Sequence, residues 1–179
     1  MKRALIFGTI VVAGILVYAA ALQKPAAPSQ QQTMLLTSSA FEQNAYIPKK
    51  FSCEGWNINP ELLIQGVPQE AKSLALIMDD PDAPRGTFTH WLVWNIDPTT
   101  TVIKEESVPP GSIEGANDAG KIGYIGPCPP PGAPHRYFFK LYALDVLLDL
   151  KSGASKTELE AALRSHSEAQ TELVGLYAR

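Results

Sequence analysis

The chain has 179 residues, of which 45% are hydrophobic and 18% charged, a length and balance typical of one globular domain. Lys2, Arg3 and Lys24 are the only charged residues before Met34, so the chain from Met34 onward holds 12 basic and 18 acidic residues. The resulting net charge of −6 disfavours a nucleic-acid partner and general adhesion to anionic lipid, because both need an excess of positive charge.

The N-terminal region contains an uncharged, largely apolar run from Ala4 to Leu22 that follows two basic residues. Such a run predicts either a signal peptide, residues 1–22, or an uncleaved membrane anchor. Because basic residues before an apolar segment stay in the cytoplasm, both alternatives place the rest of the chain outside the cytoplasmic membrane, exported or anchored by residues 4–22. Residues 23–33, rich in Pro, Ala and Gln, predict a flexible linker, which leaves 34–179 as the folded domain.

Short apolar segments between many prolines and glycines predict strands rather than a helical bundle. The first two candidates are Met34–Phe41 and Glu61–Gln65. Ser73–Met78 and Trp91–Ile96 are continuous apolar runs, typical of strands that are buried on both faces. Arg136–Val146 is the longest candidate, and both of its alternating faces are largely apolar, so we expect a central strand there.

One helix is predicted near the C-terminus, where Ser155 and Glu158 form the Ser-x-x-Glu pattern of a capping box. Apolar residues then recur at helical spacing, and we expect the helix to end near Ser165 or His166. Residues 170–177 predict a last strand. Several strands before one late helix favour a mainly β domain with the helix packed at one end.

A short loop rich in Asp and Pro follows the apolar run Ser73–Met78. Its sequence from Asp79 to Gly86 is DDPDAPRG, and each proline biases the residue before it toward extended geometry. Asp80 is therefore predicted on a rigid loop at the end of a buried strand, a good position for a ligand-binding group. The alternative is an ordinary turn, in which the Asp side chains accept hydrogen bonds from neighbouring backbone N–H groups.

Two histidines, His90 and His135, each lie at the start of a predicted core strand. If these strand ends share one side of the sheet, both imidazoles can meet Asp80 and offer N–H donors to an anion. The same three residues could instead hold a divalent metal, although no HxH or HExxH spacing supports this. A structural histidine bound to a carbonyl group is the third alternative. Phosphate-binding loops and nucleophile elbows are absent from the sequence, so we expect no cofactor and no catalytic residue.

The segment Gly126–Pro134 has the sequence GPCPPPGAP, in which five prolines remove most backbone donors. It predicts either a rigid surface connection or a preformed wall beside a pocket, where Gly126 would let a ligand approach the backbone. The two cysteines, Cys53 and Cys128, have a unique pairing if a disulfide forms, and two unlinked thiols are the alternative.

Taken in order, these segments resemble the phosphatidylethanolamine-binding protein family, in its bacterial and archaeal Raf-kinase-inhibitor-like branch. The resemblance is carried by FSCEGWNINP at 51–60, DDPDAPRGTFTHWLVWNI at 79–96 and NDAGKIGYIGPCPPPGAPHRYFFKLYALD at 117–145. It extends over the domain from about Thr37 to the end of the chain, and the order of the motifs is more specific than any one of them.

The resemblance implies a phosphatidylethanolamine-binding-like fold, in which a large antiparallel sheet packs on a smaller sheet with peripheral helices. It also implies cis peptide bonds near a small cavity that binds anionic groups such as phosphate or a phospholipid head group. The matching positions that would line this cavity are Asp80, His90 and His135, with Gly126, Pro129 and Tyr137 beside them.

We therefore expect an extracytoplasmic binding protein for a small anionic or phosphorylated ligand, with the membrane as a further partner through the N-terminal segment. One alternative is a protease- or kinase-inhibitor-like module that binds a protein partner through an exposed loop. The other is a metal-dependent hydrolase that uses Asp80, His90 and His135 as metal ligands.

Overall fold

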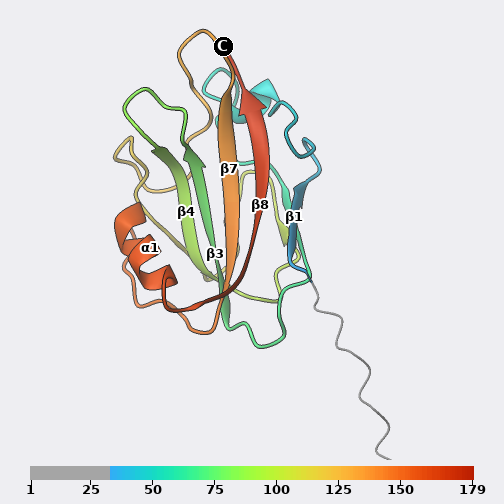
Figure 1. Ribbon diagram of the computed structural model, residues 1–179, viewed down its shortest axis with the longest axis vertical. Coiled ribbons are helices and arrows are strands. Elements are labelled where there is room, and N and C mark those ends of the chain that lie inside the picture. The colour runs from blue at the N-terminus through green and yellow to red at the C-terminus, as the bar shows by residue number, and fades with distance from the viewer. Residues whose placement is uncertain (1–32) are drawn as a thin grey trace, which may run out of the picture. The chain divides into compact units, whose positions relative to one another are not determined.

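Eight strands and one α-helix occur in residues 33–179, the part of the chain that the computed structural model describes (Figure 1). All strand pairs are antiparallel. The larger sheet has the order β6-β4-β3-β7-β8 and consists of β3 (Ser73–Asp80), β4 (Phe88–Ile96), β6 (Ile113–Glu114), β7 (His135–Leu144) and β8 (Ser167–Tyr177). The smaller sheet has the order β1-β2-β5 and consists of β1 (Leu35–Ser38), β2 (Leu62–Gln65) and β5 (Val102–Ile103).

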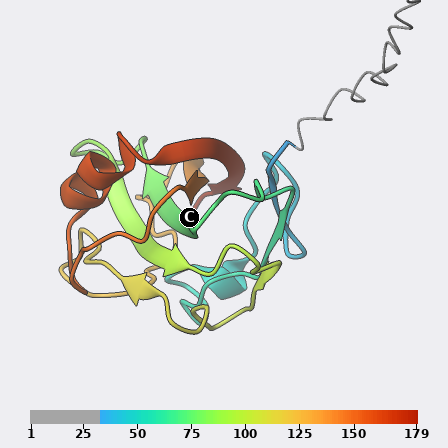
Figure 2. The same cartoon turned by 90° about the horizontal axis from the view of Figure 1, so that it is seen from below.

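Residues 33–179 also contain two helical elements, the α-helix α1 (Lys156–Leu163) and the short 3-10 helix η1 (Lys49–Phe51). Figures 1 and 2 show α1 on one side of the larger sheet and the smaller sheet on the other. The mainly β architecture with two packed antiparallel sheets confirms the fold class predicted from the sequence.

The two faces of the larger sheet each cover an apolar core. Leu74, Leu76 and Met78 of β3 face the smaller sheet, and Ala75 and Ile77 face α1. All eight residues of β3 are buried, as expected for a continuous apolar run. β7 lies between β3 and β8, in agreement with its prediction as a central strand.

The C-terminal elements differ in their bounds from the prediction. The capping box at Ser155 and Glu158 is formed, but α1 ends at Leu163, and β8 begins at Ser167 rather than at Gln170. Two of the three extra residues of β8, Ser167 and Glu168, are polar, and the segment is extended because it pairs with the end of β7. Pairing with a neighbour therefore overrides the weak local pattern here.

The prediction of a membrane segment needs correction. Within residues 33–179, no helix is long and apolar enough to cross a membrane, and α1 has only eight residues. The described part of the chain therefore contains no transmembrane helix. Residues 1–22, for which either was predicted, and the linker up to Gln32 lie outside the described residues. The cis peptide bonds implied by the resemblance are likewise not found in 33–179.

Candidate ligand-binding pocket

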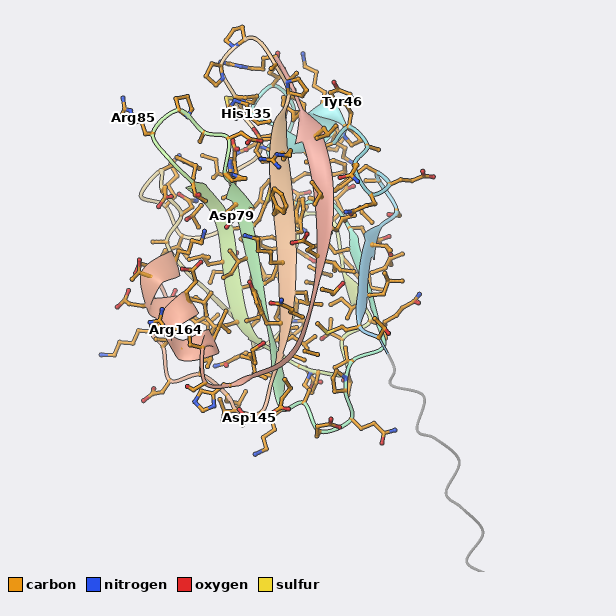
Figure 3. All side chains as sticks on the ribbon, in the orientation of Figure 1. Tyr46, Asp79, Arg85, His135, Asp145 and Arg164 are labelled. Carbon is orange, nitrogen blue, oxygen red and sulfur yellow. A yellow bond between two sulfur atoms is a disulfide. The ribbon has the colours of Figure 1, made fainter. Side chains whose placement is uncertain are left out.

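A pocket of about 160 Å³ opens at the end of the larger sheet where β3 ends and β7 begins. Figure 3 shows His135 at this end of the domain, near the loop from which Arg85 projects. The pocket is lined by residues of three strands and two loops, namely Asp80, Ala83, Pro84, Phe88, His90, Ile125, Gly126, Cys128, Pro129, Pro130, His135 and Tyr137. The six residues predicted as ligand-binding all lie in this lining.

A β-bulge in β4 brings His90 to the pocket. Met78 of β3 pairs with Trp91, but the next residue, Asp79, pairs with Thr89, so His90 is an extra residue without a partner on β3. Strict alternation would place neighbours on opposite faces of a strand. At a bulge this alternation is interrupted, so Trp91 can join the core between the sheets while the adjacent His90 lines the pocket.

The His90 ring is almost fully buried, and one hydrogen bond fixes its orientation. Its Nδ1 lies 2.7 Å from the carbonyl oxygen of Ile125. A carbonyl can only accept, so Nδ1 carries a proton and Nε2 is the nitrogen that titrates. Burial lowers the pKa of His90, although the Ile125 carbonyl and the carboxylates of Asp80, Asp79 and Asp118 oppose this shift. His90 is therefore neutral near pH 7, and its Nε2 then accepts rather than donates.

Asp80 and His135 form the second fixed pair of the pocket. His135 Nδ1 lies 2.8 Å from Asp80 Oδ2, and the other carboxylate oxygen, Oδ1, accepts the backbone N–H of Asp82 at 2.8 Å. The carboxylate of Asp80, which is 3% exposed, thus has a partner on each oxygen. Since Nδ1 donates to this carboxylate, Nε2 of His135 is again the nitrogen at which a ligand could be bound.

Tyr137 contributes a buried hydroxyl group. Its ring packs edge-on against the His90 ring, with 5.2 Å between the ring centroids. Burial, followed by the negative charge of Asp80, raises the pKa of Tyr137, so the hydroxyl keeps its proton. Within the described residues this oxygen has no hydrogen bond of good geometry, although the Asp80 carboxylate and the Cys128 backbone lie near enough to affect its pKa. A buried polar group without a partner costs about 1–3 kcal/mol. A ligand oxygen in the pocket would accept this hydrogen bond.

The segment 126–134, called the pocket wall below, closes one side of the pocket. A disulfide joins its Cys128 to Cys53, with 5.4 Å between the Cα atoms. The backbone N–H of Cys53 also donates to the carbonyl oxygen of Pro127 at 3.1 Å. On the other side, Arg179 Nε donates to the carbonyl oxygen of Pro129 at 2.6 Å.

Gly126 has a role that the sequence did not indicate. A Cβ atom at this position would lie 2.2 Å from the carbonyl oxygen of Phe51 and 2.9 Å from Ser52 Cα. The backbone N–H of Gly126 donates to Asn57 Oδ1 at 2.7 Å. The close approach of the chain after η1 therefore requires glycine here, in addition to any approach of a ligand.

The loop after β3 is fixed to β7 by an ion pair. Arg136 donates from Nε and from the guanidinium end to both carboxylate oxygens of Asp82, at 2.9 and 2.7 Å, and its backbone N–H donates at 3.0 Å. The side-chain hydrogen bonds of Arg136 lower the pKa of Asp82 to about 2. The loop that carries Ala83 and Pro84 into the pocket is thus held at its base.

The structure adds apolar lining residues that sequence reasoning missed: Ala83, Pro84, Phe88 and Ile125. Pro130 belongs to the segment 126–134 that was predicted as a wall beside a pocket. Phe88 had a usable signal, because it lies two residues before His90 in the same strand, and side chains at this spacing share a face. No group of three or more His, Cys, Asp or Glu side chains in residues 33–179 is placed to hold a metal ion. No donor set in that range therefore supports the metal-dependent alternative.

The comparisons with known proteins agree on one family. The family model described as phosphatidylethanolamine-binding protein matches residues 37–178. A UPF0098 protein of Pyrococcus horikoshii, PH1269, is 51% identical over 157 residues, which cover 84% of this chain and 79% of the relative. A UPF0098 protein of Methanothermobacter thermautotrophicus is 50% identical over 151 residues, which cover 82% of this chain and 99% of the relative.

Two solved structures have the same fold. The structure of CT736 from Chlamydia trachomatis, described as a putative phosphatidylethanolamine-binding protein homologue, has a TM-score of 0.79 and 44% identity, and covers 83% of this chain and 99% of its own. YbcL of Escherichia coli, described as a member of the mammalian family, has a TM-score of 0.78 and 32% identity, and covers 82% of this chain and 98% of its own.

Proposed function

Because this chain belongs to the phosphatidylethanolamine-binding protein family, we propose that its pocket binds a small anionic or phosphorylated ligand. The observation that carries the proposal is the meeting of His90, His135 and the unpartnered hydroxyl of Tyr137 in one pocket. Two imidazoles and one phenol can each donate a hydrogen bond to an anionic oxygen.

Tight binding of the anion requires that the histidines take up protons. In their neutral forms, His90 and His135 both present the lone pair of Nε2, because Nδ1 already donates to Ile125 and to Asp80. An unprotonated phosphate oxygen is repelled by such a lone pair, whereas the cationic imidazole presents an N–H and a positive charge. The positive charges also offset the buried carboxylate of Asp80. The bound state is therefore the anion together with protonated histidine.

The polar residues lie deep in the pocket, and apolar residues lie at its entrance. Asp80, His90 and Tyr137 are buried, whereas Pro84 and Pro130, which line the same pocket, are exposed. An anionic group would thus lie deep in the pocket, with an apolar substituent against the prolines and Phe88. We expect phenyl phosphate to bind more tightly than inorganic phosphate, since it adds apolar contact and keeps three phosphate oxygens for the polar groups.

The test is a titration of the full chain with inorganic phosphate and with phosphoethanolamine, in which the histidine ring resonances are followed by NMR. Saturable shifts of His90 and His135 are expected, and they should be lost in His90→Ala. The third histidine offers a matched control: His166 lies 2.8 Å from Asp145, which is at the opposite end of the domain from His135 (Figure 3). His166→Gln should leave the titration unchanged.

Absence of any response at millimolar phosphate or phosphoethanolamine would contradict the proposal and favour the inhibitor-like alternative. In that case a protein partner would be sought, and pocket variants such as His90→Ala should leave its binding unchanged.

The disulfide supports a compartment outside the reducing cytoplasm, because glutathione and thioredoxin systems keep most cytosolic thiols reduced. We therefore place the functional, oxidised protein outside the cytoplasmic membrane. Fractionation of the native host, with trapping of free thiols at lysis, tests this placement. Recovery in the cytosolic fraction with both thiols reduced would contradict it.

A further inference from the structure

The pocket wall is buried at Gly126, Pro127 and Pro129, and exposed at Cys128 and from Pro130 to Pro134. It supplies Gly126, Cys128, Pro129 and Pro130 to the pocket lining. Its five prolines have no N–H, so few of its residues can donate a backbone hydrogen bond. One such donor, Gly132, reaches the carbonyl oxygen of Arg179 only at 3.4 Å. Side chains and the disulfide must therefore hold this wall.

Cys53 provides two of the wall's attachments. Its sulfur is bonded to Cys128, and its N–H donates to Pro127 one residue earlier in the wall. Cys53 follows η1, whose Phe51 and the adjacent Ser52 are buried in the domain. The disulfide therefore connects a weakly held segment to a firmly packed one.

The disulfide is also reachable from solvent, since both Cys53 and Cys128 are exposed. Attack by a thiolate requires access to one of the two sulfur atoms, and both belong to residues that are exposed at the surface. Cys128 lines the pocket at the same time. The disulfide therefore lies at the surface and, through Cys128, beside the pocket.

We propose that the Cys53–Cys128 disulfide is a redox latch on the pocket: when it is intact the wall holds the ligand, and when a dithiol reduces it the wall opens. This inference rests on the proposed function, because the ligand is the anion described above. In the reaction a thiolate of the dithiol attacks one sulfur, and a mixed disulfide forms as the S–S bond breaks. The second thiol of the dithiol then displaces the remaining cysteine, leaving two cysteine thiols and the oxidised dithiol.

The reduced wall keeps the hydrogen bonds at Pro127 and Pro129 but loses its covalent connection. The exposed part of the wall from Pro130 onward is then no longer fixed against the ligand, so the apolar side of the ligand is exposed to water and its release is faster. The buried groups Asp80, His90 and Tyr137 belong to strands and are unaffected. We therefore expect weaker binding with an intact domain.

The test compares the full chain in its oxidised form with the same protein reduced by dithiothreitol. Free thiols are counted, the affinity for phosphate is measured from the His90 and His135 shifts, and exchange of the Cys128, Gly132 and Ala133 amides is followed. Reduction should weaken the affinity about tenfold or more and accelerate exchange in the wall, while β3 amides stay protected. Reoxidation should restore both.

Two variants sharpen the comparison. Cys53→Ser with Cys128→Ser should show the reduced behaviour with or without dithiothreitol. Arg179→Ala removes the hydrogen bond to Pro129 but keeps the disulfide, so its affinity should still respond to reduction. Should the double cysteine variant fail to fold, the reversible reduction of the unmodified protein still decides the question.

An unchanged phosphate affinity in protein with two counted thiols would overturn the latch. If even the oxidised protein does not bind phosphate, the proposed function fails, and amide exchange decides the latch separately. Faster exchange of the wall amides on reduction would then support wall release, and unchanged exchange would refute it.

Discussion

His90 donates from Nδ1 to a carbonyl group, so Nε2 is the nitrogen that gains or loses a proton as the pH changes. Burial lowers the pKa of His90 in the unliganded protein, and a bound anion would raise it. Because His90 is protonated more readily with the anion bound, the affinity for the anion is highest at low pH. The affinity then falls as the pH rises through the pKa of His90 in the complex. The carboxylates of Asp80, Asp79 and Asp118 influence the same ring and act in the direction of protonation.

Sulfate is the suitable probe for this pH dependence, because it keeps its charge over the range in which histidine titrates. Its affinity should fall by up to about tenfold per pH unit for each proton taken up, between about pH 5 and about pH 8. His90→Gln should reduce the slope and His166→Gln should not. A flat profile in the unmodified protein would mean that neutral donors hold the anion.

The hydroxyl of Tyr137 allows binding and stability to be separated. Tyr137→Phe removes a buried oxygen that has no partner in the described residues, so the free energy of unfolding without ligand should stay the same or rise by up to about 1 kcal/mol. Affinity for phosphate should fall roughly threefold to tenfold, the range expected for one lost hydrogen bond. Urea unfolding and phosphate titration measure the two effects. A loss of stability would show that the hydroxyl is satisfied within the fold.

The loop between β3 and β4 depends on the ion pair of Asp82 with Arg136. The pKa of Asp82 is lowered to about 2, so the stabilisation it contributes is complete above its ordinary pKa of 3.8 and is lost as pH falls toward 2. Both side chains are partly exposed to solvent, and the effect should therefore be small.

Asp82→Asn should lower the free energy of unfolding slightly at neutral pH, and the difference from the unmodified protein should disappear in acid. Arg136→Gln is the matched partner, and the double variant should be no less stable than either single one. An undiminished difference at about pH 2 would mean that the amide disturbs the loop by another route.

The strands show which elements a local pattern predicts. Ser73–Met78 and Trp91–Ile96 were recognised because every residue is apolar or neutral, and such runs fit only the interior. β5 and β6 have two residues each and carry no pattern to detect. The polar start of β8 exists only because β7 lies beside it. A local sequence pattern therefore predicts strands whose own residues are apolar, and it misses strands that form only by pairing with a neighbouring strand.

The pocket shows the same division. The six expected lining residues came from motifs and from resemblance, and they do lie together. The bulge at His90, the lack of a partner for Tyr137 and the approach of Gly126 to Phe51 depend on register and distance, which no local pattern contains. The membrane segment was predicted from an uncharged apolar run behind two basic residues, and no spanning helix is found in the part of the chain that the structure describes.

For the whole molecule, the disulfide closes a loop across 75 positions of sequence. Chain-entropy arguments give about 4 kcal/mol of stabilisation for a loop of this length. Replacing Cys53 and Cys128 by serine should lower the free energy of unfolding by that order, measured in urea without ligand. Reduced unmodified protein should unfold at the same urea concentration as the variant. A difference of less than about 1 kcal/mol would mean that the reduced chain is already restricted when unfolded.

The bulge in β4 has an evolutionary consequence. Since His90 is the extra residue opposite a regular β3, loss of its codon would let Thr89 and Trp91 follow one another in an uninterrupted ladder. Such a deletion would remove an imidazole from the pocket while leaving the hydrophobic layers on their proper faces. The hydrogen bond from Ile125 to the backbone at this position would be lost as well. The pocket could therefore be gained or lost through a change in chain length, a kind of event that comparisons restricted to substitutions do not register.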